Sequence, residues 1–414
     1  MGDFRWRFVA LVVSVYLVLA VVWVSLAYSE PGFRGLVLPP GSEVVFFDGV
    51  RGVAVFSFAG SGYVYFYWGG VVYGLGFGVS SACYDGSRLF VAGGSRVFAV
   101  GSNGVSDVFV FDVDARVVGV VCDVDGYAVL ASNESLLVVR LVDGLGFRLG
   151  LGNFSSGGVT ALHAGGGVYV ASGNRVAFFG GGVADVYVFP EEVSVSGLAV
   201  SSDGLVVYGS WGDKGFIYRF GGEAMLLEVP GRVTSVDALA CSGYRCVAVM
   251  RPVGDWLILA EFNMWRYVSH VKVVATKPYV YHGSGSSGAV WASGEIEGLG
   301  VVVVEASSTR EVVVGFNSTL AVVFTEKRVE PPPKLSKLAG QPSTFKVETE
   351  PVKLSLARSS EGLDRADLEV KTVKAQVDRL SVLTTLTALA TPALVYLYAL
   401  AVRESRGGAS PPQA

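Results

Sequence analysis

The residues best suited to chemistry in this chain are its three histidines, His163, His270 and His282. Each stands in a segment of strand or turn character, and none belongs to a paired metal-ligand motif. Two histidines from different repeats could converge on a central channel and hold a metal ion. We interpret them instead as separate polar residues at strand edges, and we predict no metal site.

A group of acidic residues offers a second chemistry. Asp123, Asp125 and Glu134 occupy the first, third and twelfth positions of a calcium-binding loop. The glycine, however, is Gly126 rather than a residue at the sixth position, and Tyr127 stands where a ligand is required. We therefore interpret this segment as a hairpin turn.

The remaining polar segments do not form a catalytic constellation. Asp112 and Asp114 follow an apolar run and are typical of the end of a strand. The serine- and glycine-rich segment 284–288 has no histidine and aspartate pattern that would activate a nucleophile. We predict no catalytic residue and no cofactor, and the sequence leans away from an enzyme.

The four cysteines indicate where the protein resides. Cys241 and Cys246 flank a four-residue loop that can bring their β-carbons within bridging distance, so we predict a disulfide between them. The alternative is a pair of small buried hydrophobic residues. Cys83 and Cys122 lie in similar strands of adjacent repeats, but their different offsets from the turn disfavour a bond. An exported location would permit a disulfide.

Three Asn-x-Ser/Thr triplets also favour export. They begin at Asn133, Asn153 and Asn317, each at a point where the strand pattern turns. Glycan attachment needs such an exposed loop. We predict glycosylation of at least one of them, against the alternative of chance triplets in a serine-rich chain.

Two uncharged apolar stretches, residues 8–27 and 380–402, bracket the chain. Each has about 20 residues, the length that a helix needs to cross a hydrocarbon core roughly 30 Å thick. Arg5 and Arg7 precede the first stretch and place the N-terminus in the cytoplasm. The first stretch is a signal anchor or, alternatively, a cleaved signal peptide with Ser25 to Ala27 near its cleavage site. The second is a transmembrane helix.

Between these stretches a turn signal recurs about every 37–40 residues, a period typical of propeller blades. Valine-, phenylalanine- and tyrosine-rich runs on either side of each turn predict four short strands per repeat. A less regular seventh unit fits from about Pro278 to Thr325. We expect Leu36 to Leu38 to add an early strand to the last repeat and fasten the ring. Glycine turns recur at Asp48-Gly49, Asp85-Gly86, Asp125-Gly126, Gly165-Gly166, Asp203-Gly204 and Ser242-Gly243.

This pattern resembles divergent β-propeller repeat proteins of the quinoprotein-like and WD-repeat-like superfamilies, over roughly residues 44–324. The chain departs from both, because the repeats carry no Gly-His and Trp-Asp signatures and no recurring tryptophan motif. The resemblance implies an all-β propeller of about seven four-stranded blades, with six or eight as alternatives. Because a fold does not specify a function, it implies no activity.

After the repeats the composition changes. Prolines at 331–333, 342 and 351 predict a semi-rigid linker. Apolar residues at steps of three and four from Leu363 to Leu380 then predict a helical stalk, with Asp367 and Lys371 at i,i+4. The stalk could form a coiled-coil homo-oligomer or lie alone as an amphipathic helix.

The expected organisation follows from these signals. The domains are a cytoplasmic N-terminus (1–7), the signal anchor (8–27), the propeller (36–328), the linker (329–362), the stalk (363–379), the transmembrane helix (380–402) and a cytoplasmic tail (403–414).

Charge and composition narrow the function. Charged residues make up only 16% of the chain and the formal net charge is −4, with no basic run in the body, so a nucleic-acid partner is not expected. We predict a propeller at the cell membrane, on its extracytoplasmic side, that binds or scaffolds a surface protein or glycan. The alternatives are a propeller hydrolase or oxidoreductase with a central-channel site, and a structural subunit of a membrane complex.

Overall fold

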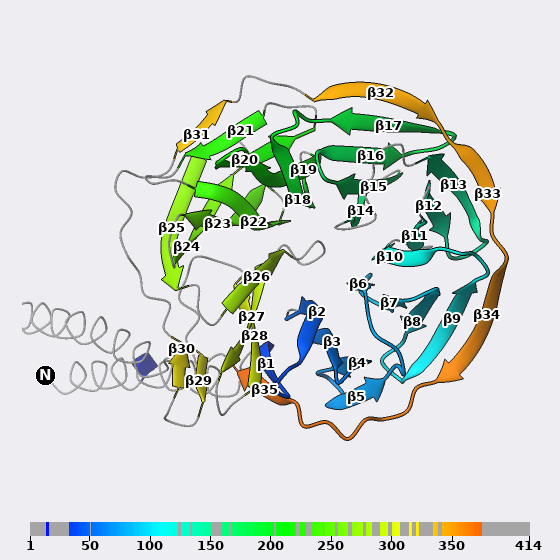
Figure 1. The fold of residues 1–414 in the computed structure, drawn as a ribbon. Coiled ribbons are helices and arrows are strands. Elements are labelled where there is room, and N and C mark those ends of the chain that lie inside the picture. Colours follow the sequence, from blue (N-terminus) through cyan, green and yellow to red (C-terminus); the bar gives the residue numbers. More distant parts are fainter. Residues whose placement is uncertain are drawn as a thin grey trace, which may run out of the picture. The chain divides into compact units, whose positions relative to one another are not determined.

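The computed structural model describes most of residues 33–374, together with Ser14 and Val15; the undescribed segments between strands are short, the longest spanning residues 323–333. Residues 33–373 form one compact unit, a ring of seven blades (Figure 1). The first strands of successive blades contact one another in sequence, and β2 also contacts β28 of the last blade. The predicted all-β propeller is therefore confirmed.

Blades are numbered here in chain order, with strands given from the axis outwards. Blade 1 is β2 (Glu43–Asp48), β3 (Val53–Phe58), β4 (Ser61–Phe66) and β5 (Val71–Gly74). Blade 2 is β6 (Ser81–Tyr84), β7 (Leu89–Gly93), β8 (Arg96–Val100) and β9 (Val105–Phe111). Blade 3 is β10 (Arg116–Val121), β11 (Tyr127–Ala131), β12 (Ser135–Arg140) and β13 (Leu145–Gly150). Blade 4 is β14 (Thr160–Ala164), β15 (Gly167–Ser172), β16 (Arg175–Phe179) and β17 (Val183–Val188).

The other three blades complete the ring. Blade 5 is β18 (Val193–Ser201), β19 (Gly204–Trp211), β20 (Lys214–Arg219) and β21 (Ala224–Glu228). Blade 6 is β22 (Val233–Ser242), β23 (Arg245–Pro252), β24 (Trp256–Asn263) and β25 (Tyr267–Ala275). Blade 7 is β26 (Tyr279–Gly283), β27 (Val290–Ile296), β28 (Gly300–Ala306) and β1 (Phe33–Leu38).

The predicted turns connect the first and second strands of blades 1 to 6. Among the described turn glycines, Gly86, Gly126 and Gly204 have φ values of 104°, 64° and 119°. Residues other than glycine rarely adopt a positive φ, which explains why glycine recurs at these turns.

Blade 7 closes the ring as the sequence predicts. Its fourth strand is the N-terminal β1, which pairs antiparallel with β28 from Gly35 opposite Val304 to Leu38 opposite Val301. The later run from Leu320 is not part of this blade. Its described residues form a separate two-stranded sheet, β29 (Val314–Phe316) with β30 (Leu320–Val322).

The core lies between the blades. Each described apolar cluster joins two neighbouring blades. One contains Val121, Leu136 and Leu149 of blade 3 together with Val170 and Phe179 of blade 4. Similar clusters join blades 1 and 2, blades 2 and 3, blades 4 and 5, and blades 7 and 1. Strands rich in valine and phenylalanine are thus buried on both faces.

The ring has two distinct faces because the strands of each blade alternate in direction. We call the face with the first-to-second and third-to-fourth strand turns the hairpin face. The opposite, connection face carries the second-to-third turns and the links between blades. Cross-blade hydrogen bonds keep these faces aligned: Val117 N donates to Gly94 O (2.8 Å) on the connection face, and Arg51 Nη1 donates to Tyr84 O (3.2 Å) on the hairpin face.

The C-terminal region corrects two predictions. Residues 334–374, here called the strap, run around the outside of the ring and add an outermost strand to blade after blade (Figure 1). Its strands are β31 (Lys334–Lys337) on blade 5, β32 (Ser343–Glu348) on blade 4, β33 (Glu350–Lys353) on blade 3, β34 (Leu356–Gly362) on blade 2 and β35 (Lys371–Lys374) on blade 7. Arg365 forms a single bridge with Tyr73 of blade 1. The predicted linker at 329–362 is therefore wrong for its described part, which belongs to the propeller.

The predicted helical stalk at 363–379 is also wrong for its described residues, 363–374, which form no helix and end in strand β35. Ala366, Leu368 and Val370 alternate with exposed residues and pack against the cluster between blades 7 and 1. Lys371 pairs with Glu369 (3.2 Å), two residues away, rather than with Asp367. The coiled coil expected there loses its basis over these residues.

The predicted membrane segments, 8–27 and 380–402, lie outside the described residues apart from Ser14 and Val15. In the part of the chain that is described, no helix has the length and apolar character needed to cross a bilayer.

The strap supplies a test of this packing. Leu354 points inward against the cluster between blades 2 and 3, whereas the neighbouring Lys353 is exposed. We expect Leu354→Ala to lower the free energy of unfolding by about 1–2 kcal/mol, below the fully buried range because the site is half-buried. Lys353→Ala should change it by less than about 0.5 kcal/mol. Urea denaturation of both variants measures the difference, and equal midpoints would contradict inward packing of the strap.

Candidate functional site

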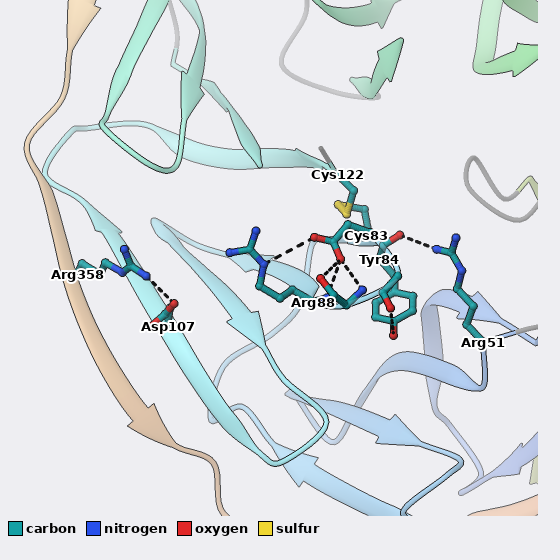
Figure 2. Close-up of polar contacts among 10 residues, drawn as sticks. Arg51, Cys83, Tyr84, Arg88, Asp107, Cys122 and Arg358 are labelled. Atoms are coloured by element: carbon teal, nitrogen blue, oxygen red, sulfur yellow. Dashed lines mark hydrogen bonds and ion pairs between the residues drawn. A yellow bond between two sulfur atoms is a disulfide. The ribbon is translucent and has the colours of Figure 1, made fainter. Parts of the chain in front are cut away.

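The hairpin face carries an ordered polar turn in blade 2 (Figure 2). Asp85 Oδ1 accepts hydrogen bonds from Ser87 N (2.7 Å), Ser87 Oγ (2.9 Å) and Arg88 N (2.7 Å). Burial raises the pKa of Asp85, but these hydrogen bonds and the nearby Arg88 charge outweigh it and hold the pKa below its usual range. A carboxylate so satisfied stabilises a turn and is a poor general base at neutral pH.

Arg51 connects blades 1 and 2 on this face. Its guanidinium lies 4.0 Å from the buried carboxylate of Asp48 and 5.4 Å from the centre of the Tyr84 ring, and it donates to the Tyr84 carbonyl. Figure 2 shows Arg51 reaching across to Tyr84. Its contacts are thus with its own blade and with blade 2, which indicates a structural role.

Both disulfides lie on the hairpin face. Cys241 and Cys246 are bonded across the first turn of blade 6, with Cα atoms 4.0 Å apart. Cys83 and Cys122 are also bonded, at a Cα separation of 5.7 Å, and join blade 2 to blade 3. The sequence argument disfavoured this second bond, and it was wrong. The offsets differ because the pairings Tyr84 with Leu89 and Val121 with Tyr127 leave turns of unequal length, 85–88 and 122–126.

The histidines occupy dissimilar places. His163 and His282 lie on the first strands of blades 4 and 7, paired with Val168 and Trp291. His270 lies on the fourth strand of blade 6, away from the axis, paired with Glu261. A site in the channel that includes His270 is therefore ruled out by the position of its strand.

Several predicted positions lie outside the described residues. They are Asp123, Asp125, Glu134, the segment 284–288 and the glycosylation candidates Asn133, Asn153 and Asn317. Among the residues that are described, no group of three or more histidine, cysteine or acidic side chains could hold a metal ion.

A polar cavity of about 570 Å³ opens on the connection face between blades 2 and 3. Its lining includes Ser95 from the second turn of blade 2, Asp114 from the link between the blades, Arg116 at the start of β10 and Ser132 at the second turn of blade 3. Phe111 N donates to Ser95 O (3.1 Å), which fixes the wall. Exposed charges of both signs beside hydroxyl groups suit a polar ligand or a protein side chain. The sequence identified Asp112 and Asp114 only as a strand end.

A second cavity, of about 410 Å³, is mainly apolar and lies between blades 3 and 4. Its lining includes Tyr127, Phe147, Phe179 and Gly180 near the hairpin-face ends of their strands, with Val352 of the strap. Arg140 at its edge forms an ion pair with Asp143. No sequence motif marks this cavity, because it depends on the strap lying over two blades.

The topology and these sites define a divergent β-propeller. No protein-family model matches the chain, and no curated protein matches it. Among solved structures, the chain is similar to the propeller domain of Cps50 (Swd1) from Myceliophteria thermophila, at 12% identity and a TM-score of 0.41, covering 67% of this chain and all of that one.

Two further solved structures are similar. The extracellular domain of a putative one-component system, BT4673, from B. thetaiotaomicron matches at 12% identity and a TM-score of 0.43, over 69% of this chain and 41% of that one. BBS1N, crystallised with ARL6DN, matches at 13% identity and a TM-score of 0.40, over 67% of this chain and 94% of that one. These similarities concern the fold alone.

The two disulfides should contribute unequally to stability. Cys83–Cys122 closes a loop with a sequence separation of 39, and Cys241–Cys246 one with a separation of 5. In the chain-entropy account, removal of the first costs about 4 kcal/mol and of the second about 2 kcal/mol. Paired Cys→Ser variants compared by chemical denaturation measure this order, and a larger loss from the short loop would contradict it.

Asp85 should make stability depend on pH. Because its pKa is lowered on folding, its contribution is present above the ordinary value of 3.8 and is lost as the pH falls further. We expect Asp85→Ala to destabilise the protein by about 1–2 kcal/mol at pH 7. The difference should shrink under acid conditions. Thermal unfolding across the pH range measures it, with the exposed Asp213→Ala on the connection face as control; a difference that stays constant into acid would contradict the assignment.

Proposed function

We propose that this protein is an exported, membrane-anchored β-propeller that binds or scaffolds a protein or glycan at the cell surface through its connection face. The observation that carries the proposal is the polar cavity between blades 2 and 3, where Asp114, Arg116 and two serines gather at the ends of rigid strands. Binding residues held on loops by a rigid scaffold are a common use of such a fold.

The proposed location is supported by cysteine chemistry. All four cysteines are in disulfides, and one of these joins two blades. Such bonds form and persist in oxidising compartments. The apolar stretches at residues 8–27 and 380–402 and the leading Arg5 and Arg7 support membrane insertion with the propeller outside.

The exposed charges beside the cavity support a polar partner. Asp112 and Asp114, on the link between the blades, and Arg116, at the start of β10, are exposed. Charge pairs of opposite sign at the rim of an interface favour orientation and specificity more than raw affinity. A partner with complementary charges is therefore expected, in preference to an apolar small molecule.

Cross-linking in native membranes tests the proposal. Lys214 lies at the second turn of blade 5 on the connection face, whereas Lys353 lies on the strap at the hairpin-face end of β33. We expect amine cross-links to a recurring heterologous protein through Lys214 and not through Lys353. The double charge reversal Asp114→Lys with Arg116→Glu should reduce that capture about tenfold or more, as for loss of close charge pairs.

The same membranes provide the controls. Protease should reach the propeller in intact cells or right-side-out vesicles, and peptide mapping should find Cys83 bonded to Cys122. Protease access only in inverted vesicles would disprove the exported topology. Capture through Lys353 alone would disprove use of the connection face. The glycan alternative predicts a different result. No protein cross-link would form, and the protein would be retained on immobilised glycans, whereas the charge-reversed variant would not.

A further inference from the structure

Large apolar side chains exposed to solvent collect on one face of the ring. Six of the seven described cases are at turns of the hairpin face, and the seventh, Phe345, is on the strap. Trp68, 76% exposed, and Val142, 60% exposed, lie in the third-to-fourth turns of blades 1 and 3. The other four are Val105, Leu145, Val183 and Tyr244. Blades 1 to 4 thus present an arc of apolar positions along the rim.

The positions within this arc repeat. Val105, Leu145 and Val183 are each the first residue of the fourth strand, in blades 2, 3 and 4. Trp68 precedes Gly69 and Gly70 at the equivalent turn of blade 1. Because these turns share one face, the side chains reach solvent on the same side, and a single flat surface could cover them all.

Several of the charges among these positions are paired within the protein. Beside Val142, Arg140 Nε donates to Asp143 Oδ1 (3.1 Å), and the same two side chains form a second, closer contact. Two other arginines of this face also lie near carboxylates: Arg88 is 3.7 Å from Asp85, and Arg51 is 4.0 Å from Asp48. A charge that is already paired is less costly to bring near an apolar phase.

The course of the chain indicates which surface covers the arc. Gly35 pairs with Val304 at the hairpin-face end of β28, and Leu38 pairs with Val301 at its other end, so β1 enters the propeller from the hairpin face. Only residues 28–32 separate Phe33 from the apolar stretch 8–27, a reach of roughly 20 Å. β35 lies beside β1, and only residues 375–379 separate it from the second stretch.

We propose that the hairpin face of the propeller rests on the lipid bilayer that anchors it, with Trp68 and the turns of blades 2 to 4 in the interfacial region. The inference rests on the membrane anchoring proposed above and adds the orientation of the ring. Tryptophan prefers the interface between water and hydrocarbon, where its ring is buried and its N–H stays hydrated. The connection face, with its polar cavity, then points away from the membrane.

Full-length protein in phosphatidylcholine liposomes tests this orientation. The liposomes are floated and washed with carbonate, and tryptophan fluorescence is then compared in lipids with and without bromine near the headgroup end of the acyl chain. Trp68→Phe should lower the brominated-lipid quenching by at most about a third, since Trp6 and Trp23 in or near the first apolar stretch are also quenchable. Trp211→Phe, in the second strand of blade 5 at its connection-face end, should leave it unchanged.

Hydroxyl-radical oxidation read by mass spectrometry provides an independent measurement on the unmodified protein. By exposure alone, Trp68 should oxidise faster than the partly buried Trp211. In liposomes we expect the reverse order, because the bilayer covers Trp68. Lower oxidation of Trp68 together with loss of quenching in Trp68→Phe supports the orientation.

The outcomes separate the two proposals. Protein that floats with the liposomes but shows Trp68 oxidised faster than Trp211 overturns the orientation and leaves the anchoring intact. Protection of Trp68 from oxidation, with bromine quenching that Trp68→Phe does not reduce, also overturns it, because a protein surface rather than lipid then covers the face. Protein that carbonate strips from the liposomes overturns the anchoring and the orientation with it.

Discussion

The apolar layers between the blades are the interaction on which the rest of the structure depends. Each blade is too thin to bury its own side chains, so its two faces are satisfied only by neighbours. The strap completes these layers at the rim: Val347, Val352, Leu363 and Leu368 pack against four successive clusters. Its backbone also pairs with outer strands that would otherwise be open edges. The strap therefore both completes the apolar layers and protects the outer strand edges.

Much of the ring could be predicted from local signals. The Asp85-Gly86 and Asp203-Gly204 turns mark the repeat because a positive φ is required there. The role of β1 also followed, since an apolar run upstream of the repeats has no partner except the incomplete last blade. These features depend on residues near one another in the sequence or on a simple count of strands.

The strap could not be predicted, because its periodicity is ambiguous. Leu363, Ala366 and Val370 satisfy helical steps of three and four, but Ala366, Leu368 and Val370 also satisfy the two-residue period of a strand. In so short and polar a segment the available pairing partner decides between helix and strand. The strap as a whole finds such partners in the outer strands of five blades and in a bridge to a sixth. Both cavities and the cross-blade disulfide also escaped prediction, because they too depend on contacts between distant parts of the chain. Each is formed by residues of different blades, whose alignment no local pattern records.

Blade 7 combines closure of the ring with attachment of its ends. β1 lies between β28 and β35, so both chain segments that lead toward the apolar stretches leave from one edge of one blade. A pull on the N-terminal segment acts along β1 and loads its pairs from Gly35 to Leu38 together, in shear, rather than opening them one at a time. The same pull acts at the hairpin face, where Cys83–Cys122 and the Arg51 contacts bind neighbouring blades. The disulfides and the Arg51 contacts thus lie on the face where β1 enters, while the connection face carries exposed charges around its cavity.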